Sequence, residues 1–174
     1  MANIPYADLG DPAIKPLVDR IVAERGSVLH LYQMLLHSPP VAEGWLALLT
    51  AIRHNCSLSP ALRELVIMRV AAVNGASYEA AQHAPIALRE GVTQQQLDDL
   101  PDWKSSSSFT PIQRAVLELT DTMTTTVQVQ PATLAALKPF LNERELVELV
   151  ATIASYNMVS RFLEALAIHA TDPR

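Results

Sequence analysis

Apolar side chains recur along the chain at the three- and four-residue spacing of amphipathic helices. The first such segment follows Asp11-Pro12 and ends at Gly26, a residue that favours the left-handed conformation of a helix C-terminus. Turns rich in Pro, Gly, Asn or Ser separate the later apolar segments, and no segment alternates convincingly enough for a β-strand. The pattern predicts eight or nine helices and an all-α fold.

Local capping signals predict where several of these helices begin. Ser59-Pro60 opens the segment ALRELVIMRVAAV, which Asn74-Gly75 ends. That segment is apolar on almost every side, so we expect it to be a central helix. Three other starts have the spacing of a capping box: Thr93 with Gln96, Thr110 with Gln113, and Asn142 with Glu145.

The length of 174 residues is enough for one hydrophobic core, so we expect a single domain over 1–174. Within it we expect N-terminal helices over 11–55, a core motif over 59–91 and C-terminal helices over 110–170. The serine-rich stretch WKSSSSF, residues 103–109, is interpreted as a flexible loop.

The composition of the chain excludes several classes of function. Hydrophobic residues make up 49% of the chain and the net charge is −5, with no cluster of Lys or Arg, which excludes a nucleic-acid partner. No basic leader and no apolar run of about 20 residues is present, so neither secretion nor a membrane partner is expected. One cysteine, Cys56, fits a reducing compartment, and we expect a cytoplasmic protein.

An ionisable pair interrupts the alanine-rich stretch NGASYEAAQHAPIALREG. Glu79 and His83 are four residues apart, so their side chains share one helix face and can hold a small molecule or exchange a proton near neutral pH. The alternative is a helix-stabilising contact of a few tenths of a kcal/mol. Pro85, just after His83, is expected to kink the helix or leave a carbonyl free.

Glu64 lies within the apolar segment that we expect to be central. A buried carboxylate needs a partner, and the candidates are Arg63, Arg69 and His83. The alternative is a first-turn glutamate that complements the helix dipole.

Two segments together resemble the carboxymuconolactone decarboxylase/AhpD-like family. They are LRELVIMRVAAVNGASYEAAQHAPIALREGVT and ERELVELVATIASYNMVSRFLEAL, and the resemblance covers roughly residues 28–168. It implies an all-helical subunit that assembles into homotrimers or homohexamers, often with the site near a subunit contact.

The resemblance does not extend to the redox chemistry of the alkyl hydroperoxidase D branch. Glu64 and His83 match that branch, but Ala76 and Glu79 stand where its two cysteines would be. A dithiol cycle needs two thiols, so peroxidase activity of that type is excluded, and Cys56 is interpreted as a small half-buried hydrophobic residue. The decarboxylase branch, which works with ionisable side chains, is the better match.

The resulting hypothesis is a cofactor-free acid–base enzyme, a lyase or isomerase, acting on a small unsaturated or lactone carboxylic acid. Glu79 and His83 would transfer the proton, while Glu64 orients His83. No metal is expected, because no second histidine joins the pair. The alternative is a non-catalytic oligomeric scaffold or small-ligand binder that kept the fold.

Three further residues are candidates for substrate binding. Tyr78 could donate its hydroxyl, and Arg161, one turn after Asn157, could bind a carboxylate with two hydrogen bonds. The alternatives are packing for Tyr78, and an interhelical or intersubunit polar link for Asn157 and Arg161.

Overall fold

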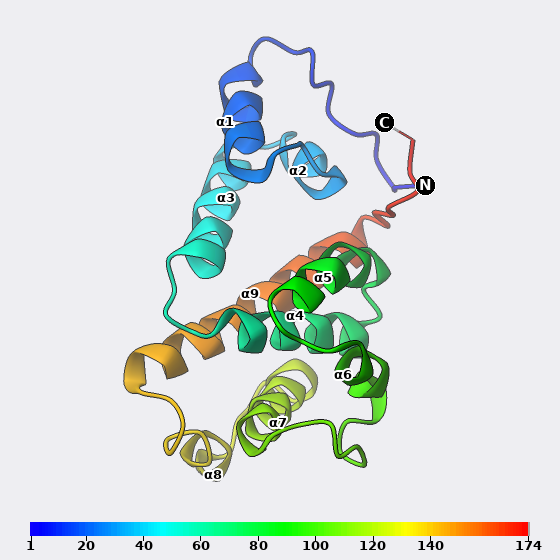
Figure 1. Cartoon of the computed structure of the whole chain (residues 1–174). Coiled ribbons are helices and arrows are strands. Elements are labelled where there is room, and N and C mark those ends of the chain that lie inside the picture. The colour runs from blue at the N-terminus through cyan, green and yellow to red at the C-terminus, as the bar shows by residue number, and fades with distance from the viewer. Residues whose placement is uncertain (174) are drawn as a thin grey trace. The chain divides into compact units, whose positions relative to one another are not determined.

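The computed structural model describes residues 1–173 of the chain and contains no strand within them, so the predicted all-α fold is confirmed (Figure 1). The helices in chain order are α1 (Lys15–Arg25), α2 (His30–Leu35), α3 (Pro39–His54), α4 (Pro60–Asn74), α5 (Ser77–Arg89), α6 (Gln94–Asp99), the 3₁₀ helix η1 (Leu100–Asp102), α7 (Pro111–Thr125), α8 (Pro131–Ala135) and α9 (Glu143–Ala165).

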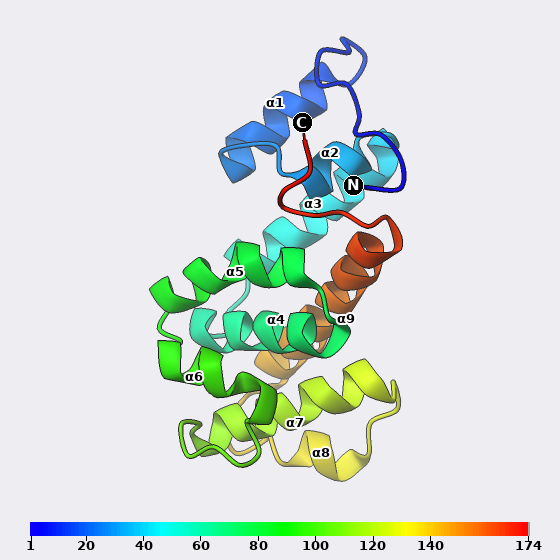
Figure 2. The same ribbon diagram turned by 90° about the vertical axis from the view of Figure 1, so that its right-hand side faces the viewer.

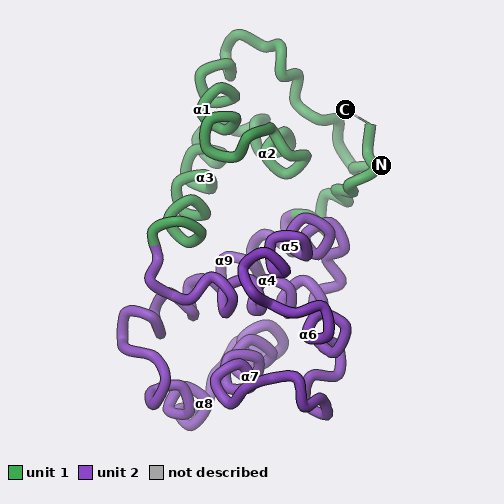
Figure 3. Tube along the Cα trace, in the orientation of Figure 1, with its two compact units in different colours: residues 1–55, 163–174 green, residues 56–162 purple. Residues whose placement is uncertain are grey.

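The chain forms two compact units (Figure 3). Unit 1 comprises Met1–Asn55 together with the chain from Leu163 onwards, and unit 2 comprises Cys56–Phe162. The single domain expected over 1–174 stays a prediction.

In unit 2, α4 lies between α5 and α7 (Figures 1 and 2). This placement follows from its composition, because a helix that is apolar on almost every side needs partners on several sides. The central position expected for this helix is therefore confirmed. The adjoining core cluster consists of Leu65, Ala87, Val92, Leu100, Trp103, Phe109 and Leu117.

The predicted capping boxes are all present. The side chains of Thr93 and Thr110 accept hydrogen bonds from the backbone N–H groups three residues later. In turn, the side-chain oxygens of Gln96 and Gln113 accept hydrogen bonds from the backbone N–H groups of the two threonines. Asn142 and Glu145 make the same reciprocal pair at the start of α9. These short-range signals were sufficient because both partners of each bond lie within one turn of the chain.

The other predicted helix starts agree with the structure only in part. Asp11-Pro12 does not start α1, because the Asp11 side chain accepts a bond from Ala13 N in a preceding turn and the helix begins at Lys15. Ser59 is the N-cap of α4 but makes no side-chain capping bond. Pro39 and Pro40 follow α2 and lie in the first turn of α3. The short helix α8 is one that the sequence did not predict.

The serine-rich segment 103–109 is anchored, contrary to the expectation of a flexible loop. Both of its flanking aromatic residues, Trp103 and Phe109, are buried. The hydroxyl groups of Ser106 and Ser108 each donate to Asp99 Oδ2 at 2.6 Å. The aromatic residues and the hydroxyl donors together tie the segment to unit 2.

Within residues 1–173, α9 is the one helix long and apolar enough, by length and composition, to cross a membrane. This finding corrects the expectation that the chain has no apolar segment long enough to span a bilayer. Half of the most apolar 18-residue window of α9 is buried inside the protein, as in the core helix of a folded domain.

Candidate active site

Glu64, on α4, is the most deeply buried of the predicted catalytic residues, with 0% of its surface exposed. Its Oε2 atom accepts a hydrogen bond from His83 Nδ1 at 2.7 Å, and its Oε1 atom accepts one from Arg63 Nε at 3.2 Å. Two of the three predicted partners are thus confirmed. The third, Arg69, instead pairs with Asp121, with Nε 2.6 Å from Oδ1.

The environment of Glu64 favours its ionised form. Burial alone raises the pKa of this carboxyl, but the hydrogen bond from His83 and the neighbouring guanidinium of Arg63 outweigh burial and hold the pKa below its ordinary value. Glu64 is therefore a carboxylate at neutral pH, able to accept hydrogen bonds but not to donate them.

His83, on α5, is oriented by two contacts. Because ionised Glu64 can only accept, the proton of a neutral His83 ring lies on Nδ1, and the lone pair lies on Nε2. The ring of Tyr156, on α9, packs edge-on against it, with ring centroids 5.2 Å apart and planes at 89°. The imidazole is thus held in one tautomer and one orientation.

Glu79, also on α5, is 2% exposed, and its Oε2 atom lies 2.5 Å from the Ser160 hydroxyl oxygen of α9. The same hydroxyl lies 3.0 Å from the Tyr156 carbonyl oxygen. The hydroxyl is the donor in both contacts, so Glu79 accepts a hydrogen bond from α9.

The predicted substrate-binding residues lie in two places. Tyr78 is buried on α5. Asn157 accepts from Asn74 Nδ2 of α4 at 3.1 Å, donates to Thr124 Oγ1 of α7 at 3.0 Å, and accepts from Arg161 at 2.6 Å. This network has the form of the interhelical polar link that was the alternative for Asn157 and Arg161, and a binding role stays a prediction.

Sequence reasoning did not find Ser160 and Tyr156. The available signal was weak: a small polar residue within an apolar stretch of α9, one turn after a tyrosine. Their partners, Glu79 and His83, lie on another helix, 81 residues earlier in the case of Ser160.

Cys56 is half-buried and free. Burial, reinforced by the negative charge of Glu148, raises the pKa of its thiol, so the reactive thiolate is disfavoured at neutral pH. Among the residues described, no group of three or more His, Cys, Asp or Glu side chains is placed to hold a metal ion.

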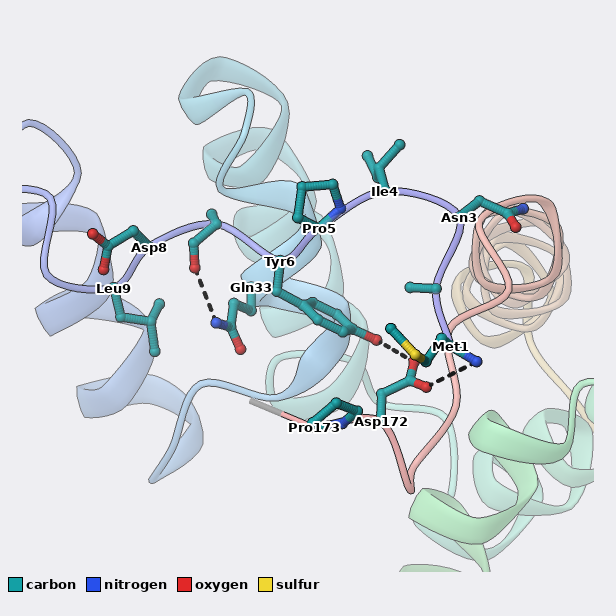
Figure 4. A pocket seen from close by; sticks show the side chains of 12 residues that line it. Met1, Asn3, Ile4, Pro5, Tyr6, Asp8, Leu9, Gln33, Asp172 and Pro173 are labelled. Carbon is teal, nitrogen blue, oxygen red and sulfur yellow. Dashed lines mark hydrogen bonds and ion pairs between the residues drawn. The ribbon is translucent and has the colours of Figure 1, made fainter.

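A cavity of about 750 Å³ lies within unit 1, beneath the N-terminal segment (Figure 4). Asp172, in its lining, accepts a hydrogen bond from the Tyr6 hydroxyl at 2.7 Å and pairs with the Met1 amino group at 3.4 Å. None of the predicted catalytic residues lines this cavity. Its lining contains no histidine, so we place the candidate chemistry in unit 2.

Comparison with known proteins supplies the family context. The model of the carboxymuconolactone decarboxylase family matches residues 39–122. The uncharacterized protein YdfG of Bacillus subtilis is 27% identical over 116 residues, which cover 66% of this chain and 79% of that protein.

Two solved structures share the fold over nearly the whole chain. One is a peroxidase-related protein with an alkylhydroperoxidase AhpD core from Ralstonia eutropha JMP134, with a TM-score of 0.83, 18% identity, and coverage of 98% of this chain and 93% of that one. The other is a cysteine-to-alanine variant of the debrominase Bmp8 in complex with 2,3,4-tribromopyrrole, with a TM-score of 0.80, 19% identity, and coverage of 97% and 92%. At these identities the likeness concerns the fold.

Proposed function

Because the model of the carboxymuconolactone decarboxylase family matches residues 39–122, we propose that the chain is a cofactor-free acid–base enzyme of the decarboxylase or isomerase type. Its substrate would be a small unsaturated or lactone carboxylic acid. We further propose that it works in the cytoplasm as a homotrimer or homohexamer.

The observation that carries this proposal is the hydrogen bond between Glu64 and His83. A buried carboxylate that binds Nδ1–H fixes the tautomer of the ring and stabilises the imidazolium that forms when Nε2 takes a proton. His83 is therefore the general base, and Glu64 is the residue that positions it.

Glu79 is assigned the complementary role of general acid. Its carboxyl is buried and accepts a hydrogen bond from the Ser160 hydroxyl, which holds it one helical turn before His83. Two ionisable side chains one helical turn apart are the parts that a proton shift between two carbons requires.

The proposed isomerisation balances without a cofactor. His83 Nε2 takes a proton from the carbon that lies between the carbonyl and the double bond, and the C–H electron pair moves into that carbonyl to give a dienolate. Glu79 then donates a proton to the far carbon of the conjugated system, and the enolate electron pair forms the new C–H bond. Proton exchange with water returns both residues to their starting states.

In a decarboxylation, the bond between carbon and the carboxylate breaks, CO₂ leaves, and the conjugated carbonyl accepts the electron pair. Glu79 then protonates the enolate at carbon. Tyr78, Asn157 and Arg161 remain the proposed contacts for the substrate carboxylate.

The chain's own cysteine content argues against a dithiol mechanism, because it has a single cysteine. The debrominase with a similar fold was solved with a tribromopyrrole, a small planar unsaturated ring. That complex supports a ring of comparable size and flatness as the kind of substrate proposed here.

A second candidate function is a non-catalytic oligomeric scaffold or small-ligand binder. Burial favours it: Glu79 is 2% and His83 8% exposed, and each already bonds a protein side chain. Side chains engaged in this way can serve packing alone.

A thermal-shift panel of small unsaturated and lactone carboxylates separates the two functions. It would be run on the wild type, Glu79→Gln and His83→Ala, with His169→Ala as a control because His169 is exposed and lies in unit 1. A ligand at 100 times its dissociation constant stabilises the folded state by about 2.7 kcal/mol. The enzyme proposal predicts that one acid stabilises the wild type and His169→Ala but not His83→Ala.

A stabilising acid would then be incubated with the wild type and followed for loss of CO₂ or movement of its double bond. Turnover that disappears in Glu79→Gln and His83→Ala supports the enzyme. Binding without turnover supports the small-ligand binder, and no binding by any acid contradicts the enzyme proposal.

A further inference from the structure

One face of α9 carries an exposed stripe. Glu143, Val147, Val150, Ala154 and Arg161 are separated by four, three, four and seven residues, so they share one side of the helix. Val147 is 69% exposed, and Val150 is half-buried. Apolar side chains exposed in a row, and not singly, mark a contact surface.

The stripe borders a groove between α9 and the α8 region. This groove has a volume of about 530 Å³, and Leu134, Leu146, Val147 and Val150 line it together with two alanines. Lys138 and Glu143 are the charged residues at its edge. The alanines, Ala151 and Ala154, keep this side of α9 low enough for another helix to approach closely.

The stripe has charges of opposite sign at its two ends. Glu143 stands in the first turn of α9 and Arg161 near its last turn, about 27 Å apart at the helical rise per residue. An antiparallel copy of the same stripe would place Glu143 of each chain opposite Arg161 of the other. A parallel copy would place like charges together, so the stripe complements itself in the antiparallel direction alone.

The middle of the stripe fits the same register. When Glu143 faces Arg161 of the second copy, Val150 faces Ala154 and Leu146 faces Met158 by residue count. At Val150 a larger side chain thus meets a smaller one, and at Leu146 a branched side chain meets a more flexible one, while Val147 falls opposite Asn157.

Arg161 is held in place for such a contact. Its Nη1 atom donates to the carbonyl and side-chain oxygens of Asn157, which is itself fixed by Asn74 and Thr124. An arginine has five N–H donors, and these bonds use one nitrogen, so the rest of the exposed guanidinium remains for a carboxylate.

We propose that two copies of this chain pair through antiparallel α9 helices, with Glu143 of each bound to Arg161 of the other. The contact is two-fold symmetric. It assigns Arg161 to the intersubunit link that was the alternative to substrate binding, and it leaves Tyr78 and Asn157 as the proposed contacts for the substrate carboxylate.

Light scattering coupled to size-exclusion chromatography tests the pairing by a charge-swap cycle. The proteins are the wild type, Glu143→Arg, Arg161→Glu and the double variant, with a monomer mass of 19.0 kDa as reference. Each reversal opposes like charges twice across the two-fold contact, so each single variant should weaken pairing at least about tenfold. The double variant restores opposite charges and should return to within about threefold of the wild type.

The control is Glu43→Arg, the same charge change at an exposed position of α3. It should leave the mass unchanged, and thermal melts of all variants show whether they fold. A wild type that is monomeric or trimeric overturns the pairing, as does a mass that the single reversals do not change or that the double variant does not restore. The readout is mass, so it is independent of enzymatic activity.

Discussion

Two residue pairs, each an arginine followed by a glutamate, show how burial changes the role of a charge. In Arg63-Glu64 both side chains are buried, and the carboxylate also binds His83. In Arg89-Glu90 the same two side chains lie at the surface, with Arg89 67% and Glu90 31% exposed and a separation of 3.6 Å. Water screens the charges of the exposed Arg89-Glu90 pair far more than those of the buried Arg63-Glu64 pair. Only the buried pair is therefore expected to influence stability.

Glu64 should make the folded state sensitive to acid. Its pKa is lowered on folding, so the stabilisation it provides is complete above the ordinary value of 4.5 and is lost as the pH falls through the lower folded value. Glu64→Gln cannot titrate, so below about pH 4.5 the slope of unfolding free energy against pH should be flatter than in the wild type. Urea unfolding across this range measures the slope.

At pH 7 the same variant should lose about 1–3 kcal/mol, because it leaves Arg63 without a buried carboxylate. Glu90→Gln is the matched control, and it should change stability by less than about 1 kcal/mol and leave the acid slope intact. Equal slopes for wild type and Glu64→Gln would contradict the ionised, buried state assigned to Glu64.

At the scale of helices, the starts of α4, α6 and α7 offer a direct comparison. Ser59, Thr93 and Thr110 are all N-cap residues, but only the two threonines accept a bond from the backbone N–H three residues later. Pro60 gives α4 a preset backbone angle instead. Residue type alone therefore does not show which caps are energetically important.

Thr93→Ala and Thr110→Ala should each lower the unfolding free energy by about 1 kcal/mol, because each leaves a backbone N–H without its partner. Ser59→Ala should cost less than about 0.5 kcal/mol, since no side-chain bond is lost. Urea titrations of the three variants measure the differences. Similar losses at all three positions would mean that the capping bonds do not set these energies.

Across the whole molecule, the sequence predicted what depends on neighbours in the chain or on burial. The capping boxes needed only residues three apart, and the partners of Glu64 followed from placing a carboxylate in an apolar helix. The Asp11 start failed because its side chain had a competing use in a turn. Ser160 was not foreseeable, because its contact with Glu79 depends on how α5 and α9 pack.

Function, like the contact of Ser160, is not determined by the fold class alone. Solved structures at 18–19% identity share the fold over nearly the whole chain, yet one is a debrominase and another is peroxidase-related. The fold therefore fixes where helices lie, whereas the reaction depends on a few side chains. In this chain we propose Glu64, His83 and Glu79 for that role.

In the proposed site Glu64 holds His83 with its proton on Nδ1, which leaves Nε2 as the base. Nitrogen-15 NMR of the imidazole rings tests this without any substrate, and the chain has only five histidines to assign. The His83 signals are those that disappear in His83→Ala. At a pH where the ring is neutral, we predict a protonated Nδ1 and an unprotonated Nε2 in the wild type, and a shift towards a mixture of tautomers in Glu64→Gln. A proton on Nε2 in the wild type would contradict the assigned geometry and the role of His83 as general base.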